Sequence, residues 1–581
     1  PPLRTAVPLW SRGLGDVYKR QVEPLTSLMR YQRNRPVDDP DSDRLAHLRL
    51  RTITKVRVVI AFGCSFLNRE IKMRITKKMG LLLVIGLSFV SSYGQLAYGQ
   101  PVNIDVNPTE YMLPQLKTGN EEIDKAFRIA LGDYFTNIQP FEIRISATVK
   151  PVILAGLDYD RPWTRDASIN SWNAGSFITP DIAKNTLVSV LTNSNDTIVV
   201  GGQYWDAIIW VTGAWNHYLV TGDKAFLALA YEATKNSLYH FENTELNKEY
   251  NLFRGLGWSD GPSAYEGKYG DFTTFKRMKG KPSEISETGH GVPMMALSTN
   301  CLYYNAYMLA HKMSKELGEE SLDWSEKALK IKEAINKHLW NDATGMYKFY
   351  IDEEEESNLQ ETIGNAYAML FGVADEDQAM AILENQKVTP AGVPSGWPPL
   401  KRYQTDSTSF PRHNAVVWPQ IQAFWAEAAA RFNRPDMLYH ELSNLAKHAN
   451  RDMQFAEIYH PYTGEIYGGI QEKGRYGVVG LWKATNRQTW SATGYIRMVL
   501  HGMLGIDVDE QGVEIEPRIP EEFEEIELTN LKYRDTLLSI KITGNGSQIS
   551  KIAVNGEVRE KAQVLNGAKG NQVIEIEMSS I

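Results

Sequence analysis

Residues 201–246, GGQYWDAIIWVTGAWNHYLVTGDKAFLALAYEATKNSLYHFENTEL, contain two helical patterns joined by a link of very few residues. Apolar side chains recur at i, i+3, i+4 and i+7 on both sides of the TGDK segment at 221–224, which is the spacing of a helix with one buried face. Because the link is so short, the second helix must run back along the first. The segment therefore predicts a helical hairpin.

The same pattern continues through most of the chain. We predict helices at about 123–138, 165–176, 179–194, 201–221, 223–246, 291–318, 320–341, 361–373, 375–390, 414–432, 434–452 and 489–505. Short links such as ITPD at 178–181 join some neighbours, and Pro180 suits the first turn of a helix. The longer loops at 247–290, 391–413 and 453–488 are rich in glycine, proline, aromatic residues and carboxylates. Loops of this length are usually functional.

The alternation of short and long links predicts a mainly α fold, an (α/α)6 toroid of six helical hairpins with its long loops on one face. A helical solenoid is the alternative, although the sequence has no fixed repeat period. After about residue 506, apolar and polar residues alternate, and Asn545-Gly546 and Asn555-Gly556 are typical of hairpin turns. We therefore expect a catalytic toroid at 123–505 and a small C-terminal antiparallel β domain at 506–581.

The first 94 residues are not expected to belong to the folded protein. DVYKRQ at 16–21 resembles the translation of a sequencing adapter, and we interpret residues 1–72 as an adapter or read-through artefact. Residues 73–94 combine a basic start, a short apolar run and a Ser-Tyr-Gly cleavage site, which are the features of a signal peptide. The apolar run is shorter than the roughly 20 residues that a membrane span requires. We therefore expect a secreted or periplasmic protein, with residues 95–122 as an N-terminal extension.

Without residues 1–94 the chain is strongly acidic. That segment holds 17 Lys and Arg and 7 Asp and Glu of the chain's 62 and 70, which leaves 45 basic against 63 acidic side chains and a net charge near −18. Such a surface repels nucleic acid and polyanions, so a neutral substrate is expected.

Cys301 is the one cysteine that remains after residue 94, and we expect it to be a small buried apolar residue. The absence of zinc, calcium, P-loop and dinucleotide-binding motifs predicts no metal and no cofactor.

The segment PWTRDASINSW at 162–172 places Arg165 and Asp166 between Trp163 and Trp172. W-T-R-D-[SA] resembles the sugar-binding motif of the glucoamylase family, and glycogen-debranching enzymes carry a related R-D pair. The resemblance implies that Arg165 and Asp166 hold hydroxyls of the terminal sugar. A guanidinium offers a fork of donors, a carboxylate accepts from neighbouring hydroxyls, and an indole such as that of Trp163 covers the apolar face of a sugar ring. A buried salt bridge is the alternative.

Two further segments resemble the six-hairpin glycosidase superfamily, which includes the debranching enzymes and α-glucosidases. QTWSATGYIRMVLHGMLGIDVDEQGVEIEPRIP at 488–520 is similar to its Q-x-W-S-A helix and the strand that follows, and HNAVVWPQIQAFWAEAAA at 413–430 is similar to its H-N-x-x-x-W-P helix. Together with the first motif, the resemblance covers most of the chain after residue 94. It makes His413, Trp418 and Trp490 candidate sugar contacts, with core packing as the alternative.

The general acid is expected in the loop FRGLGWSDGPSAYEG at 253–267, because inverting glycosidases of this fold commonly take the acid from this connection. Asp260 lies close to Trp258 and to glycines, so its backbone can approach a ligand and its carboxyl can be partly desolvated, which raises a pKa. Glu266 is the alternative in the same loop, and Glu287 is a weaker one. W-S-D-G departs here from the paired acidic W-E-E of glucoamylases, which leaves the acid less well defined than the sugar contacts.

The base is expected in the loop FAEIYHPYTGEIYGG at 455–469. This loop resembles the E-x-Y-x-P-x-T-G segment of related α-glucosidases, in which the first Glu activates water. The resemblance implies that Glu457 is the base, with Glu465 as the alternative.

GGQYWDAIIW at 201–210 adds Trp205 and Asp206, at the start of a helix, as candidate binding residues.

These features predict an exo-acting, inverting α-glycosidase that removes a neutral terminal sugar from an oligosaccharide or polysaccharide. The leading expectation for its substrate is an α-glucoside. An α-L-rhamnosidase-like or mannosidase-like hydrolase on the same fold is the nearest alternative. A sugar epimerase that acts through His290, His413 or His460, and a glycan-binding protein without catalysis, are further alternatives. We expect no nucleic-acid partner and no membrane span, and the sequence leaves the oligomeric state open.

Overall fold

The computed structural model describes residues 106–579, apart from 195, 260, 272–291, 321, 474–477 and 545. Contacts divide the chain into two compact units, and all described residues except Lys473 and Val478 belong to the unit formed by 104–472 and 479–581. The fold and the site below lie in that unit. The predicted signal peptide at 73–94 falls outside the described residues, and the predicted domain boundaries stay predictions.

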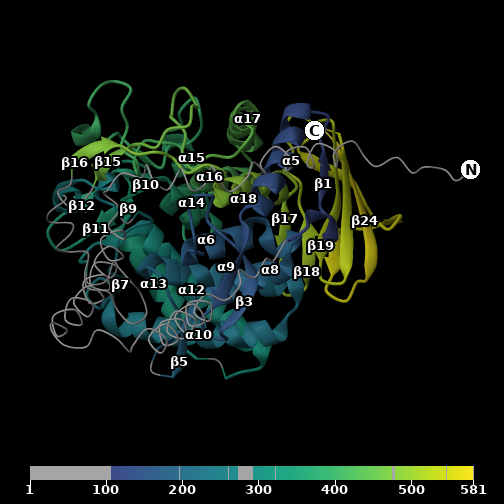
Figure 1. Cartoon of the computed structure of the whole chain (residues 1–581), viewed down its shortest axis with the longest axis horizontal. Coiled ribbons are helices and arrows are strands. Elements are labelled where there is room, and N and C mark those ends of the chain that lie inside the picture. The colour runs from purple at the N-terminus through teal and green to yellow at the C-terminus, as the bar shows by residue number, and fades with distance from the viewer. Residues whose placement is uncertain are drawn as a thin grey trace, which may run out of the picture. The chain divides into compact units, whose positions relative to one another are not determined.

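Helices that alternate along the chain form a closed inner ring. Its members are α6 (Thr164–Asn170), α9 (Tyr204–Thr221), α12 (Leu297–Leu317), α14 (Thr362–Leu370), α16 (Pro419–Arg431) and α18 (Thr489–Arg497). Each contacts the next, and α18 contacts α6. In Figure 1, α6, α9 and α14 lie in the middle of the helical part.

An outer set of helices surrounds this ring. It consists of α5 (Glu121–Thr136), α8 (Pro180–Ser189), α10 (Lys224–Thr244), α13 (Trp324–His338), α15 (Glu376–Asn385) and α17 (Pro435–Asp452), with the short α7 (Ser176–Ile178) ahead of α8. Outer and inner helices alternate in sequence, and α5 packs against both α17 and α18, which closes the outer layer. The predicted (α/α)6 toroid is thereby confirmed.

The link at residues 221–224 shows how the sequence enforces a hairpin. Gly222 ends α9 with φ of 71°, a left-handed conformation that costs glycine little. Asp223 then caps α10, because its carboxylate accepts a hydrogen bond from the backbone N–H of Phe226 at 2.9 Å. Proline occupies the first turn of α8, α16 and α17, including the predicted Pro180.

The longer connections, which lead from each outer helix to the next inner one, contain short strands that were not predicted. They are β2 (Ile138–Ile143), β3 (Thr148–Ile153), β4 (Leu191–Ser194), β5 (Thr197–Val200), β6 (Leu246–Asn247), β7 (Leu252–Phe253), β8 (Met295–Ala296), β9 (Trp340–Asn341), β10 (Met346–Tyr347), β11 (Tyr350–Ile351), β12 (Glu356–Ser357), β13 (Gln360–Glu361), β14 (Gly396–Trp397), β15 (Ile470–Lys473) and β16 (Val478–Leu481). The helix predicted at 179–194 thus ends at Ser189, because residues 191–194 pair with β5. Strands of two to six residues are too short to leave a clear pattern in the sequence.

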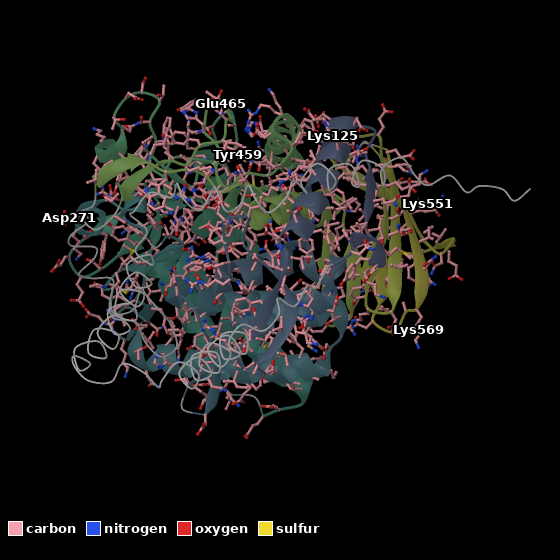
Figure 2. The ribbon with its side chains drawn as sticks, viewed as in Figure 1. Lys125, Asp271, Tyr459, Glu465, Lys551 and Lys569 are labelled. Atoms are coloured by element: carbon pink, nitrogen blue, oxygen red, sulfur yellow. The ribbon has the colours of Figure 1, made fainter. Side chains whose placement is uncertain are left out.

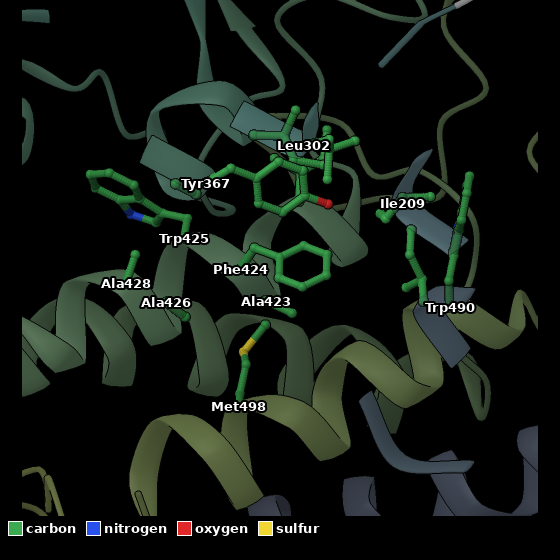
Figure 3. Close-up of a cluster of buried hydrophobic side chains, with 14 of the residues drawn as sticks. Ile209, Leu302, Tyr367, Ala423, Phe424, Trp425, Ala426, Ala428, Trp490 and Met498 are labelled. Atoms are coloured by element: carbon green, nitrogen blue, oxygen red, sulfur yellow. The ribbon is translucent and has the colours of Figure 1, made fainter. Parts of the chain in front are cut away.

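Side chains from five inner helices meet at the centre of the ring. Figure 3 shows Ile209 of α9, Leu302 of α12, Tyr367 of α14, Phe424 of α16 and Trp490 of α18 in one cluster. All five are buried. The predicted burial of Cys301 is confirmed, because this α12 residue is 0% exposed. Among the described helices, none is long and apolar enough to cross a membrane.

The C-terminal part is a β domain, as predicted. Its strands are β17 (Ile506–Val508), β18 (Gly512–Ile515), β19 (Glu525–Tyr533), β20 (Thr536–Thr543), β21 (Gln548–Val554), β22 (Glu557–Val558), β23 (Gln563–Leu565) and β24 (Gly570–Ser579). The main sheet has the order β1-β19-β20-β24-β21-β22, in which β1 (Gln115–Lys117) comes from the N-terminal side and β20 pairs with β24 in parallel. All other pairs in this sheet are antiparallel.

The hairpin turns predicted at the two Asn-Gly dipeptides compare differently with the structure. Asn555 and Gly556 both have positive φ and join β21 to the antiparallel β22, so the predicted hairpin turn is confirmed. Asn545 lies outside the described residues. It falls between β20 and β21, which are not neighbours because β24 lies between them. A hairpin between those two strands was therefore the wrong prediction.

Candidate active site

The first turns of the inner helices contact one another in sequence around one end of the ring. Arg165 of α6 reaches Asp206 of α9, and the Nε1 of Trp205 of α9 donates to the Oγ of Ser298, in the first turn of α12, at 3.3 Å. Ser298 in turn donates to Glu361, the residue before α14. Trp418 precedes α16 and contacts Trp490 of α18 through their rings. The predicted site residues of four inner helices, α6, α9, α16 and α18, thus share one end of the toroid.

Hydrogen bonds to Asp206, Trp258 and Gln203 hold Arg165 in place. Its Nε donates to the Asp206 carboxylate at 2.8 Å, its Nη1 to the Trp258 carbonyl at 2.8 Å, and its Nη2 to the Gln203 side chain at 3.0 Å. The guanidinium also lies 5.2 Å from the centre of the Trp205 ring. Among the described residues, Arg165 forms an ion pair with Asp206 of another helix, and this pair links α6 to α9.

Asp166 is buried, and no described residue donates a hydrogen bond to its Oδ1. Burial raises the pKa of Asp166 to about 8; the neighbouring Arg165 lowers it, and the Asp206 and Glu457 carboxylates raise it further. The Tyr159 phenol lies near the same groups. Burial raises its pKa most, and the charges of Glu457 and Asp166 raise it further. A buried carboxyl with an unused oxygen is suited to accept a hydroxyl of a ligand.

Replacing Asp166 with asparagine is expected to lower kcat/KM about 2- to 12-fold at neutral pH, because its carboxyl is then mostly protonated and a neutral hydrogen bond contributes about 0.5 to 1.5 kcal/mol. The folded-state pKa of Asp166 lies above its unfolded value, so its contribution to stability is complete below about pH 4 and is lost as the pH rises through 8. As the pH rises from 4 to 8, the melting temperature of the asparagine variant should therefore fall less than that of the wild type. Unchanged kinetics with a large loss of stability would instead support a purely structural role.

Glu457 is buried beside Asp166. Its Oε2 accepts from the Arg412 guanidinium at 2.8 Å and from the backbone N–H of Thr485 at 2.9 Å. Arg412 is itself anchored, because its Nη1 donates to the Gly468 carbonyl at 2.7 Å. The alternative base, Glu465, is exposed at a turn, and Figure 2 shows it at the edge of the molecule. Of the two carboxylates in this loop, Glu457 is the one that joins the site.

Three predicted aromatic residues and His413 form one cluster next to these carboxylates. Trp258 contacts His413 and Trp418 edge-on, at centroid distances of 5.5 and 5.1 Å, and Trp418 contacts Trp490 at 5.8 Å. The Trp418 Nε1 donates to the Arg412 carbonyl, whereas no described residue accepts from the buried Nε1–H of Trp490. Trp163 lies apart from this cluster, against Tyr159.

Asp260, the predicted acid, lies outside the described residues, but both of its flanks are fixed. On one side the Trp258 carbonyl accepts from Arg165. On the other side Gly261 is so close to His413 that a Cβ there would lie 3.2 Å from the imidazole. The Nδ1 of His413 is 2.8 Å from the Ser263 hydroxyl. The backbone on either side of Asp260 therefore contacts the same residues as the rest of the site.

The other predicted candidates do not gather here. Glu266 accepts a hydrogen bond from the Ser357 hydroxyl at 2.6 Å, at strand β12, and no described contact connects it with Asp166 or Glu457. The Nε2 of His460 is 3.2 Å from the Thr408 carbonyl. Glu287 and His290 lie outside the described residues. No cluster of three or more His, Cys, Asp or Glu side chains that suits a metal occurs in the described ranges.

Glu361 is a buried carboxylate that sequence reasoning missed. It accepts from the backbone N–H of Ser298 at 2.9 Å, from the Ser298 hydroxyl at 2.6 Å and from the backbone of Trp258. Burial raises the pKa of Glu361 and these hydrogen bonds lower it. The effect of burial is larger, so the pKa lies at about 7. Side chains at Gly257 or Gly364 would collide with its oxygens. Glu361 therefore fixes the backbone of Trp258, whose carbonyl holds Arg165.

Replacing Glu361 with glutamine is expected to lower kcat/KM about tenfold, because the amide offers one acceptor atom to three donors and one hydrogen bond to the Trp258 loop is weakened. The wild type should also lose activity as the pH falls through 7, where the carboxylate is protonated, and the glutamine variant should lack this limb. A pH series of kcat/KM measures both effects. Glu441→Gln is a matched control, since Glu441 is a buried carboxylate of raised pKa on the outer helix α17. An identical profile in Glu361→Gln and Glu441→Gln would contradict the role.

Two more residues of the site were missed, Tyr159 and Arg412. Tyr159 lies four residues before Trp163, and Arg412 directly precedes the H-N-x-x-x-W-P segment, so both are adjacent to motifs that the sequence analysis quoted. Neither has a local pattern of its own. Arg412 contacts Glu457, and the charge of Glu457 raises the pKa of the Tyr159 phenol, although Glu457 lies far from both in the sequence.

Comparison with protein families gives two matches. The model of the mannosylglycerate hydrolase MGH1-like glycoside hydrolase domain matches residues 165–491, which is more than half of the chain. The model of the glycosyl hydrolase family 65 C-terminal domain matches residues 506–559. No curated protein matches the chain. The first match spans the toroid from Arg165 to α18, and the second lies in the β domain.

Solved structures with a similar fold include a sialidase, 14% identical with a TM-score of 0.59 over 84% of this chain and 44% of that protein. A GH78 family rhamnosidase of a Bacillus species is 14% identical, with a TM-score of 0.48 over 80% and 44% of the two chains. A GH63 mannosylglycerate hydrolase from Thermus thermophilus, in complex with glucose, is 13% identical, with a TM-score of 0.48 over 64% and 100%. The chain thus spans less than half the length of the first two. At these identities the sialidase match concerns the fold alone.

Proposed function

Because this chain belongs to the MGH1-like glycoside hydrolases and is therefore a glycoside hydrolase, we propose that it is an exo-acting, inverting α-glycosidase. Its substrate in this proposal is a neutral terminal sugar, an α-glucoside, at the end of an oligosaccharide or polysaccharide. Arg165 and Asp166 hold the hydroxyls of that sugar, Asp260 is the general acid and Glu457 is the general base. The protein acts outside the cytoplasm in this proposal, because of the predicted signal peptide at 73–94.

The observation that carries the proposal is the buried pair of carboxyl groups, Asp166 and Glu457, among Trp258, Trp418 and Trp490. Sugar sites need this combination, because carboxylates bind hydroxyls while indole rings cover the apolar face of the pyranose. Burial also strengthens every charge in the site, since water no longer screens it.

The two carboxyl groups differ in what surrounds them. Glu457 accepts hydrogen bonds from the Arg412 guanidinium and the Thr485 N–H, and these contacts orient its carboxylate as a base that takes a proton from water requires. Asp166 has an unused oxygen and a raised pKa, which suits a ligand contact. In an inverting glycosidase the acid and base stand about 6.5 to 9.5 Å apart, so that a water fits between the base and the sugar. Asp260 then protonates the leaving oxygen while Glu457 activates the water on the opposite face.

A panel of aryl α-glycosides tests the identity of the sugar. We expect hydrolysis of the α-D-glucoside in preference to the α-D-mannoside and the α-L-rhamnoside. Preference for either of the latter would replace the glucosidase assignment with a mannosidase-like or rhamnosidase-like one. If the active enzyme cleaved internal linkages of a polysaccharide and released no sugar from the chain ends, the prediction of exo-acting hydrolysis would be wrong.

A further inference from the structure

An exposed tryptophan, Trp482, extends the aromatic cluster of the site to the surface. It follows β16 directly and is 37% exposed, whereas Trp418 of the cluster is buried. The Arg412 guanidinium contacts both rings, at 5.8 Å from the centre of Trp482 and 5.4 Å from that of Trp418. The same guanidinium binds Glu457 at 2.8 Å. Trp482 is therefore separated from the proposed base by one side chain, and none of the roles assigned above uses it.

Close backbone packing fixes Trp482 in this place. Its N–H donates to the Gly469 carbonyl at 2.9 Å, and a side chain at Gly469 would collide with the Arg412 backbone. The φ of +77° at Gly469 also favours glycine. Ile470, which opens β15, donates its N–H to the Phe410 carbonyl at 2.8 Å and accepts from the Arg412 N–H at 2.9 Å. The start of β15, and with it Trp482, is therefore bound to the segment that carries Arg412.

Gln471, the next residue of β15, reaches the loop of the proposed acid. Its Oε1 lies 3.8 Å from the position that a Cβ at Gly261 would take, and Gly261 directly follows Asp260. The Gln471 side chain is partly exposed, and in the part of the chain that the structure describes its amide has no hydrogen-bond partner. In a glycosidase the leaving group stands beside the acid, which protonates it. Gln471 thus lies where the leaving group is expected, on the strand whose start binds Arg412.

We propose that Trp482 and Gln471 form an outer subsite, which holds the second sugar of the substrate, the unit to which the terminal sugar is linked. The indole covers the apolar face of this sugar, and the amide of Gln471 exchanges hydrogen bonds with its hydroxyls. Because the nearby Arg412 is already paired with Glu457, the outer subsite offers a ring and an amide to a neutral unit. The inference rests on the proposed function for the terminal sugar. It narrows the substrate to a glycoside whose leaving group is itself a neutral pyranose.

Calorimetric titration of the full chain tests the proposal with D-glucose and with sulfur-linked α-glucosyl-glucose disaccharides, which resist cleavage. The 1,4- and 1,6-linked forms are both titrated, and the one that binds more tightly is used. The wild type should bind it at least about tenfold more tightly than glucose, because only the disaccharide reaches the outer subsite. Trp482→Ala should weaken disaccharide binding about tenfold and Gln471→Ala about 2- to 12-fold, with glucose binding unchanged. Equal affinity for glucose and disaccharide in the wild type, or unchanged disaccharide affinity in either variant, would overturn the proposal.

Leu481→Ala is the matched control, because Leu481 is an exposed apolar residue of the same strand pair, directly before Trp482. It should change neither affinity. Trp482→Phe keeps a flat ring and should retain most of the disaccharide affinity. A loss in Leu481→Ala as large as that in Trp482→Ala would assign the effect to the strand pair as a whole and overturn the role of the indole.

Two further ligands separate the possible outcomes. Phenyl 1-thio-α-D-glucoside should bind more weakly than the disaccharide, because its phenyl ring has no hydroxyl for Gln471. Equal or tighter binding would assign the subsite to an aromatic leaving group and overturn the proposal. The leaving group of α-D-glucosyl fluoride is too small to reach Trp482, so its hydrolysis tests the proposed function alone. If the fluoride is not hydrolysed while disaccharide binding still depends on Trp482 and Gln471, the proposed function fails and the outer subsite stands.

Discussion

Replacing Glu457 with glutamine is expected to lower kcat about 10²- to 10⁴-fold, because the variant keeps the shape of the side chain but cannot take a proton from water. The loss should be the same for substrates with good and with poor leaving groups, since the base acts on the water. Sodium azide, which needs no deprotonation, should restore sugar release and yield the β-glycosyl azide from an α-glycoside. Rates on aryl α-glycosides, with and without azide, measure the effect.

Glu465→Gln is the matched control for this experiment. Glu465 belongs to the same loop and carries the same group, but it is exposed at a turn and bound to neither Arg412 nor Thr485. We expect near-normal activity in this variant. Near-normal activity in Glu457→Gln, or a large loss in Glu465→Gln, would move the base from one glutamate to the other. Melting curves of both variants show whether a loss of activity reflects unfolding.

Replacing Asp260 with asparagine is expected to lower activity on an unactivated disaccharide about 10²- to 10⁴-fold, because the leaving oxygen is no longer protonated. Activity on a 2,4-dinitrophenyl glycoside should fall far less, since that leaving group departs without a proton. This dependence on the leaving group separates an acid from a residue that only binds the sugar. The measurement is kcat/KM for the two substrates in the wild type and in the variant.

Glu266→Gln is the corresponding control, because Glu266 is the other carboxylate predicted in the acid loop. Its hydrogen bond to Ser357 places it at strand β12, so its removal should cost little activity on either substrate. A strong dependence on the leaving group in Glu266→Gln, together with none in Asp260→Asn, would reverse the assignment of the acid.

The helical ring was predictable because its signals are local. Each inner or outer helix has its own apolar periodicity, and links such as Gly222-Asp223 carry their own turn and cap residues. The helix ends were less predictable, because strands such as β4 and β5 contain only four residues each. The parallel pair of β20 and β24 was also missed, since pairing between distant strands leaves no local pattern.

The candidate site could be predicted only as far as its motifs extend. The segment at 162–172 identified Arg165 and Asp166, but not that Arg165 pairs with Asp206, which is 41 residues away. Glu361 has no motif at all, and its role depends on Ser298 and Trp258, which come from two other connections. Residues that position others through long-range contacts are visible only when the chain is folded.

Inversion by direct displacement is the central claim of the mechanism, and proton NMR of the first-formed sugar tests it most directly. An aryl α-D-glucoside is mixed with the enzyme at a concentration high enough to release product faster than the free sugar interconverts between anomers. Attack by water activated at Glu457, on the face opposite the leaving group, predicts that the β-anomer appears first and the α-anomer only later. An α-anomer that appears first would contradict the account.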